Sequence, residues 1–147
     1  MKCVLSLSTF AVLAGAMLAS GSPADADAAS RHVLRPNSAG GATATNMRAV
    51  RGPYGGYAAR AGSTSVNPDG SASHRSGFAA AGARGSVESS GSASRDASGN
   101  VTQNRSTTAT SAVTGNSVQS STSYSSGSGL THSATCYSAA GAVIPCR

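Results

Sequence analysis

Histidine is the first residue type to examine for catalysis or metal binding, and this chain has three: His32, His74 and His132. They lie far apart in the sequence, with no cysteine or carboxylate at the spacing of a metal site. The Asp69-Gly70 pair lacks the acidic pattern of a calcium loop and indicates a turn instead. Neither a Gly-x-Ser-x-Gly motif nor a Walker or dinucleotide-binding motif occurs. We therefore expect no metal, no cofactor and no enzymatic activity.

Two cysteines near the end of the chain predict a disulfide. Cys136 and Cys146 flank a segment in which Tyr137, Val143 and Ile144 form the densest apolar cluster outside the N-terminal segment. Their spacing is not the Cys-x-x-Cys of a redox-active pair. In an exported protein, a bond between them would stabilise the last hairpin by about 2–3 kcal/mol. A disulfide between subunits is the alternative.

Arginine supplies nearly all of the positive charge. Arg75, Arg84, Arg95 and Arg105 recur every nine to eleven residues. They are the candidate contacts to a polyanion, either an acidic polysaccharide or an anionic surface of lipid headgroups. Because they are spread evenly and lack interleaved aromatic residues, the alternative role is solubility and protection of strand edges. Export disfavours nucleic acid as a partner.

The N-terminal segment predicts that export. Lys2 precedes an uncharged apolar stretch over residues 4–18, shorter than the ~20 residues that a transmembrane helix needs. Two small-x-small sites follow within residues 24–28, as in a secretory signal peptide. We interpret residues 1–28 as a signal peptide, with no transmembrane segment in the mature chain. The expected location is secreted, periplasmic or on the cell surface.

The composition argues against a conventional packed core. Ser, Ala, Gly and Thr number 28, 28, 18 and 12, which is 86 of 147 residues. From residue 30 onward, only 12 of 118 residues are Leu, Ile, Val or Phe. Ordinary globular domains contain about twice that fraction or more. An enzyme domain that folds around its own core is therefore excluded.

The residue composition and the pattern of turn signals change near residue 62. Residues 29–61 mix arginine with Gly, Ala, Pro and Asn without a helical or strand period, which predicts a disordered basic arm. In residues 62–147, turn signals separate runs rich in Ser, Thr and Val, which favour extended chain. One predicted hairpin joins residues 110–113 to residues 118–124. The sequence of residues 70–75 resembles that of residues 91–96, 21 positions later, which suggests a weak internal repeat. A chance match is the alternative, because the composition is so simple.

Alternating residues in the second half predict three stripes on strand faces. Each stripe has apolar residues at its ends and small polar residues between them, a pattern that fixes strand register poorly. The stripes are Val101, Gln103, Arg105, Thr107, Ala109, Ser111 and Val113; Val118, Ser120, Thr122 and Tyr124; and Leu130, His132, Ala134 and Cys136.

Together these features predict a mostly β, low-complexity fold. It is a β-meander of short Ser/Thr/Val strands, with a disordered N-terminal arm and a C-terminal disulfide loop. The function we expect is that of an exported, non-enzymatic structural or interaction protein of the cell surface or extracellular matrix, which self-associates through β-strands. The alternative is a secreted Arg-rich binding module or effector that engages an acidic partner. A secreted chain with no fixed fold is the third option.

Overall fold

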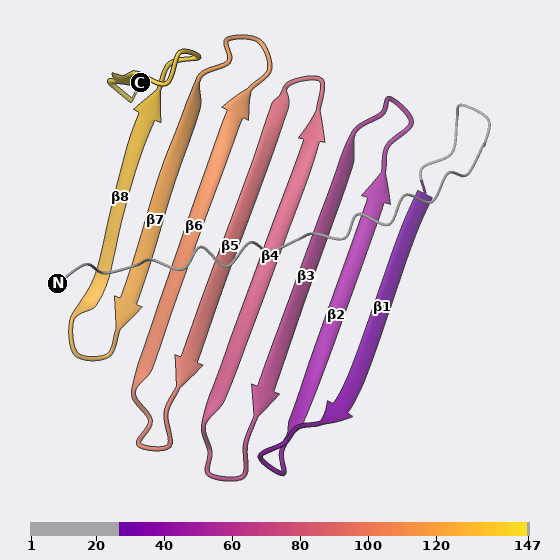
Figure 1. The fold of residues 1–147 in the computed structure, drawn as a ribbon, viewed down its shortest axis with the longest axis vertical. Helices are drawn as coiled ribbons and strands as arrows, with labels where there is room; N and C mark the ends of the chain where they lie inside the picture. The colour runs from indigo at the N-terminus through magenta and orange to yellow at the C-terminus, as the bar shows by residue number, and fades with distance from the viewer. Residues whose placement is uncertain (1–26, 147) are drawn as a thin grey trace, which may run out of the picture.

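The computed structural model describes residues 27–146, which form one antiparallel sheet of nine strands in chain order (Figure 1). The strands are β1 Asp27–Pro36, β2 Ala42–Arg51, β3 Tyr57–Val66, β4 Ala72–Gly82, β5 Gly85–Arg95, β6 Val101–Ser111, β7 Ser117–Ser125, β8 Gly129–Tyr137 and β9 Val143–Ile144. The predicted mostly β fold and its β-meander are thereby confirmed for the described residues. The predicted signal peptide lies outside them except for Asp27 and Ala28, which begin β1.

Near-identical turns connect most of the strands. In the first turn, Gly40 N–H donates to the Asn37 carbonyl (3.2 Å) and Asn37 N–H donates to the Gly41 carbonyl (3.0 Å). Gly40 has a φ of 80°, the left-handed conformation that closes a three-residue hairpin loop. The turns that start at Gly52, Asn67, Asp96 and Ser138 repeat both hydrogen bonds.

The structural repeat is therefore one strand plus one turn. From Gly40 to Gly129, successive left-handed glycines are 14 to 16 residues apart. The 21-residue repeat read from the sequence has no structural counterpart, because Gly70 lies in a turn while Gly91 lies in the middle of β5.

The prediction of a disordered arm over residues 29–61 is wrong. These residues form most of β1, all of β2 and the first half of β3, in continuous register with the rest of the sheet. Their glycine-containing turns keep the same interval as those further along the chain. Few aliphatic residues are needed here, because main-chain hydrogen bonds rather than a buried core hold these strands together.

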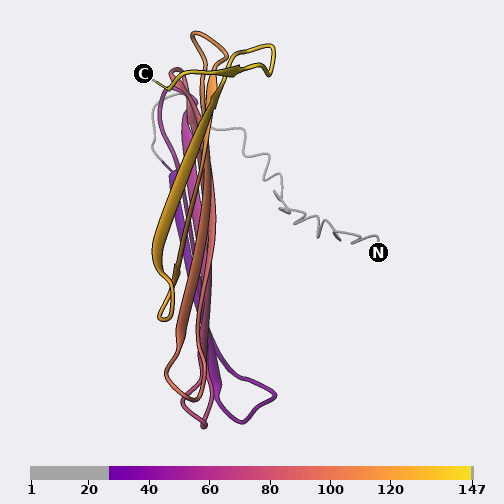
Figure 2. The ribbon, with the colours of Figure 1, turned by 90° about the vertical axis from the view of Figure 1, so that its left-hand side faces the viewer.

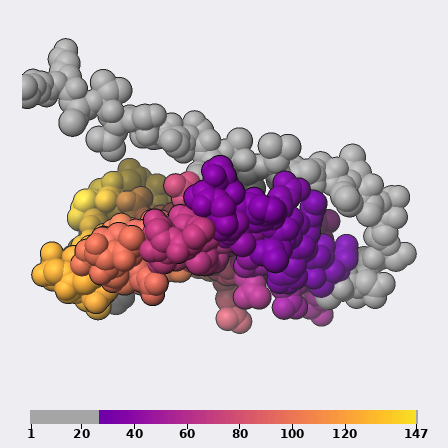
Figure 3. All heavy atoms as spheres, turned by 90° about the horizontal axis from the view of Figure 1, so that it is seen from below, coloured from indigo at the N-terminus to yellow at the C-terminus, as the bar shows by residue number. Residues whose placement is uncertain are grey.

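The sheet has a single layer. Figure 2 shows it edge-on as a thin twisted slab, and in Figure 3 the colour of the described atoms runs from indigo to yellow across its width. No hydrophobic or polar side chain among the described residues is fully buried. The nearest equivalent of a core is one row of cross-strand neighbours near the upper end of Figure 1, which we call the apolar row. The apolar row consists of Ala28, Val50, Ala58, Ala80, Val87, Ala109, Val118, Cys136 and Ile144.

The hairpin and the stripes predicted in the second half are confirmed. β6 and β7 pair around a turn at residues 112–116, with Ala109 opposite Val118 and Arg105 opposite Thr122. Val118 in turn lies opposite Cys136 on β8. Directly opposed residues point to the same side of a sheet, so all three stripes share one face. Only the end of the first stripe departs, because Val113 lies in the turn.

Hydrogen bonds also join neighbouring turns at the lower end of the sheet. Asn37 Nδ2 donates to Asn67 Oδ1 in the next turn on that side (2.9 Å). Further along, Arg95 Nη2 donates to the Gly70 carbonyl (2.9 Å) and Val101 N–H donates to Ser126 Oγ (2.6 Å). These bonds connect neighbouring hairpins at their turns, in addition to the main-chain hydrogen bonds between their strands.

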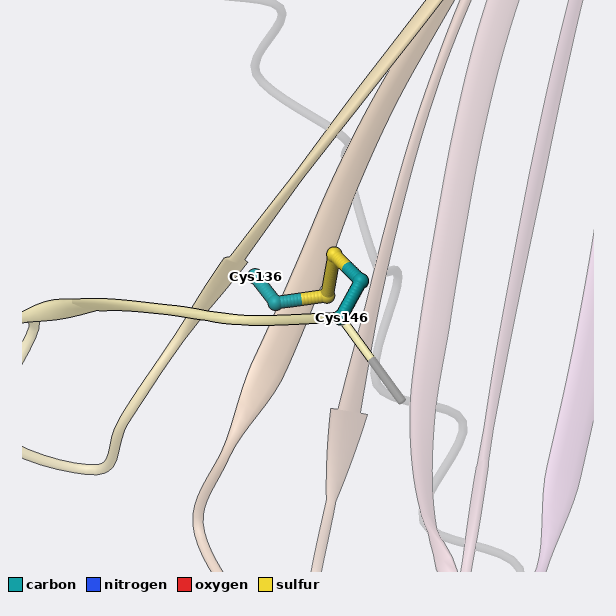
Figure 4. The surroundings of a disulfide bond; sticks show 2 residues. All are labelled: Cys136 and Cys146. Carbon is teal, nitrogen blue, oxygen red and sulfur yellow. A yellow bond between two sulfur atoms is a disulfide. The ribbon is translucent and has the colours of Figure 1, made fainter.

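The C-terminal disulfide is formed as predicted, within one chain (Figure 4). Cys136 is bonded to Cys146, and their Cα atoms are 5.3 Å apart. Cys136 also lies opposite Ile144, and Tyr137 lies opposite Val143. The bond therefore holds the two-residue strand β9 against the upper end of β8.

Candidate functional site

The two faces of the sheet differ in charge and chemistry. One carries all three histidines and the apolar row, and we call it the histidine face. It presents even-numbered residues of β1–β4, β7 and β8, and odd-numbered residues of β5 and β6. The strand carboxylates, Asp27 and Glu88, belong to the opposite face, and Asp69 and Asp96 lie in turns. The described strands therefore place no carboxylate on the histidine face.

Two arginines lie directly opposite each other on this face. Arg48 of β2 is the cross-strand neighbour of Arg60 of β3, and Arg60 is in turn opposite Phe78 of β4. Like charges in directly opposed positions destabilise a sheet pair. With no carboxylate on the same face, the described strands offer this pair no compensating negative charge.

A hollow on the histidine face contains this arginine pair. It has a volume of ≈ 780 Å³, and Arg48, Arg60 and Arg105 contribute to its lining. Gly62 and Ser76 lie between them in the register, where small side chains leave the surface low. Gly62 is the one described residue that is buried. Little room is left for a larger side chain at this position, since an added Cβ would lie 3.4 Å from the side-chain amide of Asn46.

Arg105 extends the positive charge towards the middle of the sheet. Its Nη1 donates to Ser89 Oγ (3.0 Å), and Ser89 Oγ also shares a hydrogen bond with Thr107 Oγ1 (2.9 Å). A second, smaller hollow of ≈ 30 Å³ lies beside it, lined in part by His74 and Gly91. The guanidinium is thus oriented by neutral partners and keeps its full positive charge for an external anion.

Two of the histidines are oriented by threonines. A hydrogen bond of 2.8 Å joins His74 Nδ1 to Thr64 Oγ1, and one of 2.9 Å joins His132 Nδ1 to Thr122 Oγ1. His32 and His74 both line the larger hollow. In the described part of the chain, no group of three or more His, Cys, Asp or Glu residues has the arrangement of a metal site.

The four arginines predicted as polyanion contacts do not form one cluster. Arg75 lies on the opposite face, and Arg84 lies in the turn between β4 and β5. Arg95 donates through Nε and Nη2 to the Gly70 carbonyl and so joins two turns. Of these four arginines, only Arg105 lines the hollow that contains Arg48 and Arg60.

Sequence reasoning missed Arg48 and Arg60 because it assigned them to a disordered arm. The signal that would have found them is the regular spacing of Gly40, Gly55 and Gly70, which frames two further strands. Counting inward from those turns would have placed both arginines at the same level of neighbouring strands.

The opposite face, which we call the hydroxyl face, is held together by side-chain hydrogen bonds across strands. Pairs of hydroxyl groups on it are 2.6 to 3.4 Å apart. They are Thr43 with Ser65, Thr45 with Ser63, Ser94 with Thr102, Ser121 with Ser133, and Ser123 with Thr131. Each such pair contributes a few tenths of a kcal/mol up to about 1 kcal/mol. These residues therefore have a structural role.

The turn carboxylates have structural roles as well. Asp69 Oδ1 accepts from Ser71 Oγ (2.7 Å) and from Ser71 N–H (2.9 Å), and these bonds lower the pKa of Asp69. The pKa of Asp96 is lowered in the same way by the side-chain amide and the N–H of Asn100. In both cases the charged form caps a turn.

The two edges of the sheet are the remaining candidate interaction sites. β1 forms one edge and contains Asp27, Arg31, Arg35 and Pro36. β8 forms the other, because β9 covers only Cys136 and Tyr137. Residues 129–135 of β8 contain no Asp, Glu, Lys, Arg or Pro, and all but Thr135 are exposed. This segment, which we call the free β8 edge, presents unpaired backbone groups without the usual protection.

Comparisons with protein-family models, curated proteins and solved structures find no match to this chain. Residues 27–146 include no helix long and apolar enough to cross a membrane.

Proposed function

We propose that this protein is an exported, non-enzymatic structural protein of the cell surface or extracellular matrix, and that it assembles by pairing β8 edges. The observation that carries the proposal is the single-layer sheet, in which Gly62 is the only buried residue among those described. A sheet normally gains stability by packing an apolar face against a second layer, which the described residues lack. Pairing with the edge of another copy adds main-chain hydrogen bonds that offset part of this loss.

The free β8 edge is the contact that suits a second copy. Leu130 is 69% exposed there, and no like charges would meet when two such edges approach. Two copies related by a two-fold axis would pair residues 130–135 antiparallel, which extends one sheet into the next. The disulfide loop occupies only the upper end of β8, so it leaves this segment accessible.

Export is supported by the same features. The intramolecular disulfide is of the kind that persists in oxidising compartments. A surface of small polar residues with no fully buried side chain suits a chain that is stabilised by its neighbours.

The proposal is tested with two matched pairs of lysine substitutions. Leu130→Lys with Ala134→Lys charges the free β8 edge at two exposed positions for which no side-chain hydrogen bond is formed. Leu34→Lys with Ala28→Lys adds the same charge to the same face of β1, at two positions that lie opposite the uncharged residues Ala44 and Val50. Sedimentation velocity of the purified protein should show association that the β8 pair weakens by at least about tenfold.

The β1 pair should leave that association within about threefold of the unmodified chain. A protein that remains monomeric at high concentration would overturn the proposal. Equal losses from both pairs would also overturn it, because the effect would then come from net charge rather than from the edge.

A further inference from the structure

We propose that the hollow on the histidine face binds an acidic polysaccharide, through sugar units that carry carboxylate or sulfate groups. This site is distinct from the free β8 edge and uses different residues. It therefore adds a ligand to the proposed structural role and does not depend on that role.

The first argument is electrostatic. Arg48 and Arg60 are held side by side by the β2–β3 register, and the histidine face has no carboxylate in the described strands. An anion between the two guanidinium groups would turn a repulsive pair into an attractive one. Arginine suits this role because its planar fork donates two parallel hydrogen bonds to a carboxylate or sulfate.

The second argument is the extent of the site. Arg60 lies on β3 and Arg105 lies on β6, three strands away. Adjacent strands are about 4.8 Å apart, so these two strands are about 14 Å apart across the sheet. A single small anion would not reach both, whereas a chain of charged sugars laid across the strands would.

The third argument is the uncharged part of the lining. Phe78 is 40% exposed and lies beside Arg60, where its ring offers a flat apolar surface for the C–H face of a sugar. Ser30 and Asn46 line the same hollow and offer hydrogen bonds to sugar hydroxyls. A few polar groups around an apolar surface in a hollow are the usual composition of a ligand site.

These features favour a polysaccharide over a membrane or a nucleic acid. Insertion into lipid headgroups would require an aromatic ring that projects from a positively charged surface. The ring of Phe78 lies instead in a hollow together with the arginines. Phe78 is the one Phe, Tyr or Trp of the lining, whereas single-stranded nucleic acid is usually held by successive stacking rings of these types.

The test compares two double variants that remove the same charge. Arg48→Gln with Arg60→Gln alters the hollow, and Arg51→Gln with Arg75→Gln removes two arginines from the hydroxyl face of inner strands. Binding is measured by calorimetry with the purified, disulfide-bonded chain. The probes are heparin for sulfate, polygalacturonate for carboxylate and neutral dextran. Phosphatidylserine-containing vesicles and single-stranded DNA serve as the competing classes.

We expect one or both acidic polysaccharides to bind with an affinity that falls as salt increases. The Arg48/Arg60 variant should lose at least about tenfold in affinity, or about 1.4 kcal/mol. The Arg51/Arg75 variant should lose no more than about threefold. Phe78→Ala should weaken polysaccharide binding several-fold while the circular dichroism of the sheet is retained.

Three results would overturn the site. The first is equal losses from the two arginine pairs, which would indicate binding by overall charge. The second is tighter binding of vesicles or DNA than of either polysaccharide, and the third is binding of dextran equal to that of the acidic polymers. The self-association of all variants is measured by sedimentation velocity, so a failure of this site is distinguishable from a failure of edge pairing.

Discussion

The two edges of the sheet are built from strands of similar length but opposite character. β1 contains two arginines, an aspartate and a terminal proline, whereas residues 129–135 of β8 contain no charged residue and no proline. Natural sheets protect their edges with charge and proline because unpaired backbone groups recruit other strands. This difference is the basis of our proposal that β1 is closed to pairing and the free β8 edge is open. An assembly with one open edge per chain stops at a pair, which distinguishes it from an open-ended fibre.

The largest effect is expected from removing the protection of β1. Arg31→Ser with Arg35→Ser would make β1 as uncharged as the free β8 edge over most of its length. Each chain would then have two open edges, and pairs should grow into long assemblies. Light scattering and electron microscopy at fixed concentration would measure this growth.

The control lowers the charge equally in inner strands. Arg51→Ser with Arg75→Ser lies on the same face, in β2 and β4. It should leave the size of the assembly unchanged. Growth of both variants to the same extent would mean that net charge, and not the β1 edge, limits assembly.

A smaller effect is expected from opening the disulfide next to the free β8 edge. Reduction of Cys136–Cys146 should lower the free energy of unfolding by about 2–3 kcal/mol, because the bond closes a short loop in the unfolded chain. It should also release β9 and lengthen the free β8 edge by two residues, so association should strengthen. Denaturant unfolding and sedimentation velocity, with and without reductant, measure the two effects. A gain in stability on reduction would contradict this account of the loop.

The apolar row should contribute less than the disulfide at any one position. Val118→Ser removes a half-buried side chain between Ala109 and Cys136 and should cost about 1 kcal/mol of unfolding free energy. Val113→Ser is the matched control, because Val113 is 86% exposed in a turn and should change stability by less than about 0.5 kcal/mol. Thermal unfolding followed by circular dichroism distinguishes them. Equal effects would show that the apolar row has no stabilising role.

The smallest effect concerns pH and the turns at the lower end of the sheet. Hydrogen bonds lower the pKa of Asp69 and Asp96 below the ordinary value of 3.8, so folding favours their charged forms. Their contribution is complete above pH 3.8 and is lost as the pH falls through the lowered pKa values. Asp69→Asn with Asp96→Asn should therefore flatten the fall in stability below about pH 4. An unchanged acid profile in this variant would contradict the capping role.

The sequence allowed the second half of the fold to be predicted better than the first. Ser/Thr/Val runs between glycine turns indicated strands after residue 62, and the alternation from Val101 to Cys136 placed three stripes that share one face. Residues 29–61 were misjudged because their arginines and prolines resemble a solvated linker. A single-layer sheet tolerates such residues, since neither face has to be buried.

The candidate site shows the same division. Cys136 and Cys146 were identifiable because a disulfide depends on two residues of a distinctive type. The arginine hollow depends on register, since Arg48, Arg60 and Arg105 are brought together by pairing across five strands. The interval between successive arginines does not reveal such a cluster, and it predicted Arg75, Arg84, Arg95 and Arg105, of which only Arg105 lines the hollow.

Hydrogen–deuterium exchange at two protein concentrations tests the central claim most directly. Backbone amides of residues 130–135 should become more protected as concentration rises, because the proposed assembly pairs a second copy with the free β8 edge. Amides of β1 should exchange at the same rate at both concentrations. Protection that increases equally at both edges, or at neither, would contradict the account of one open and one closed edge.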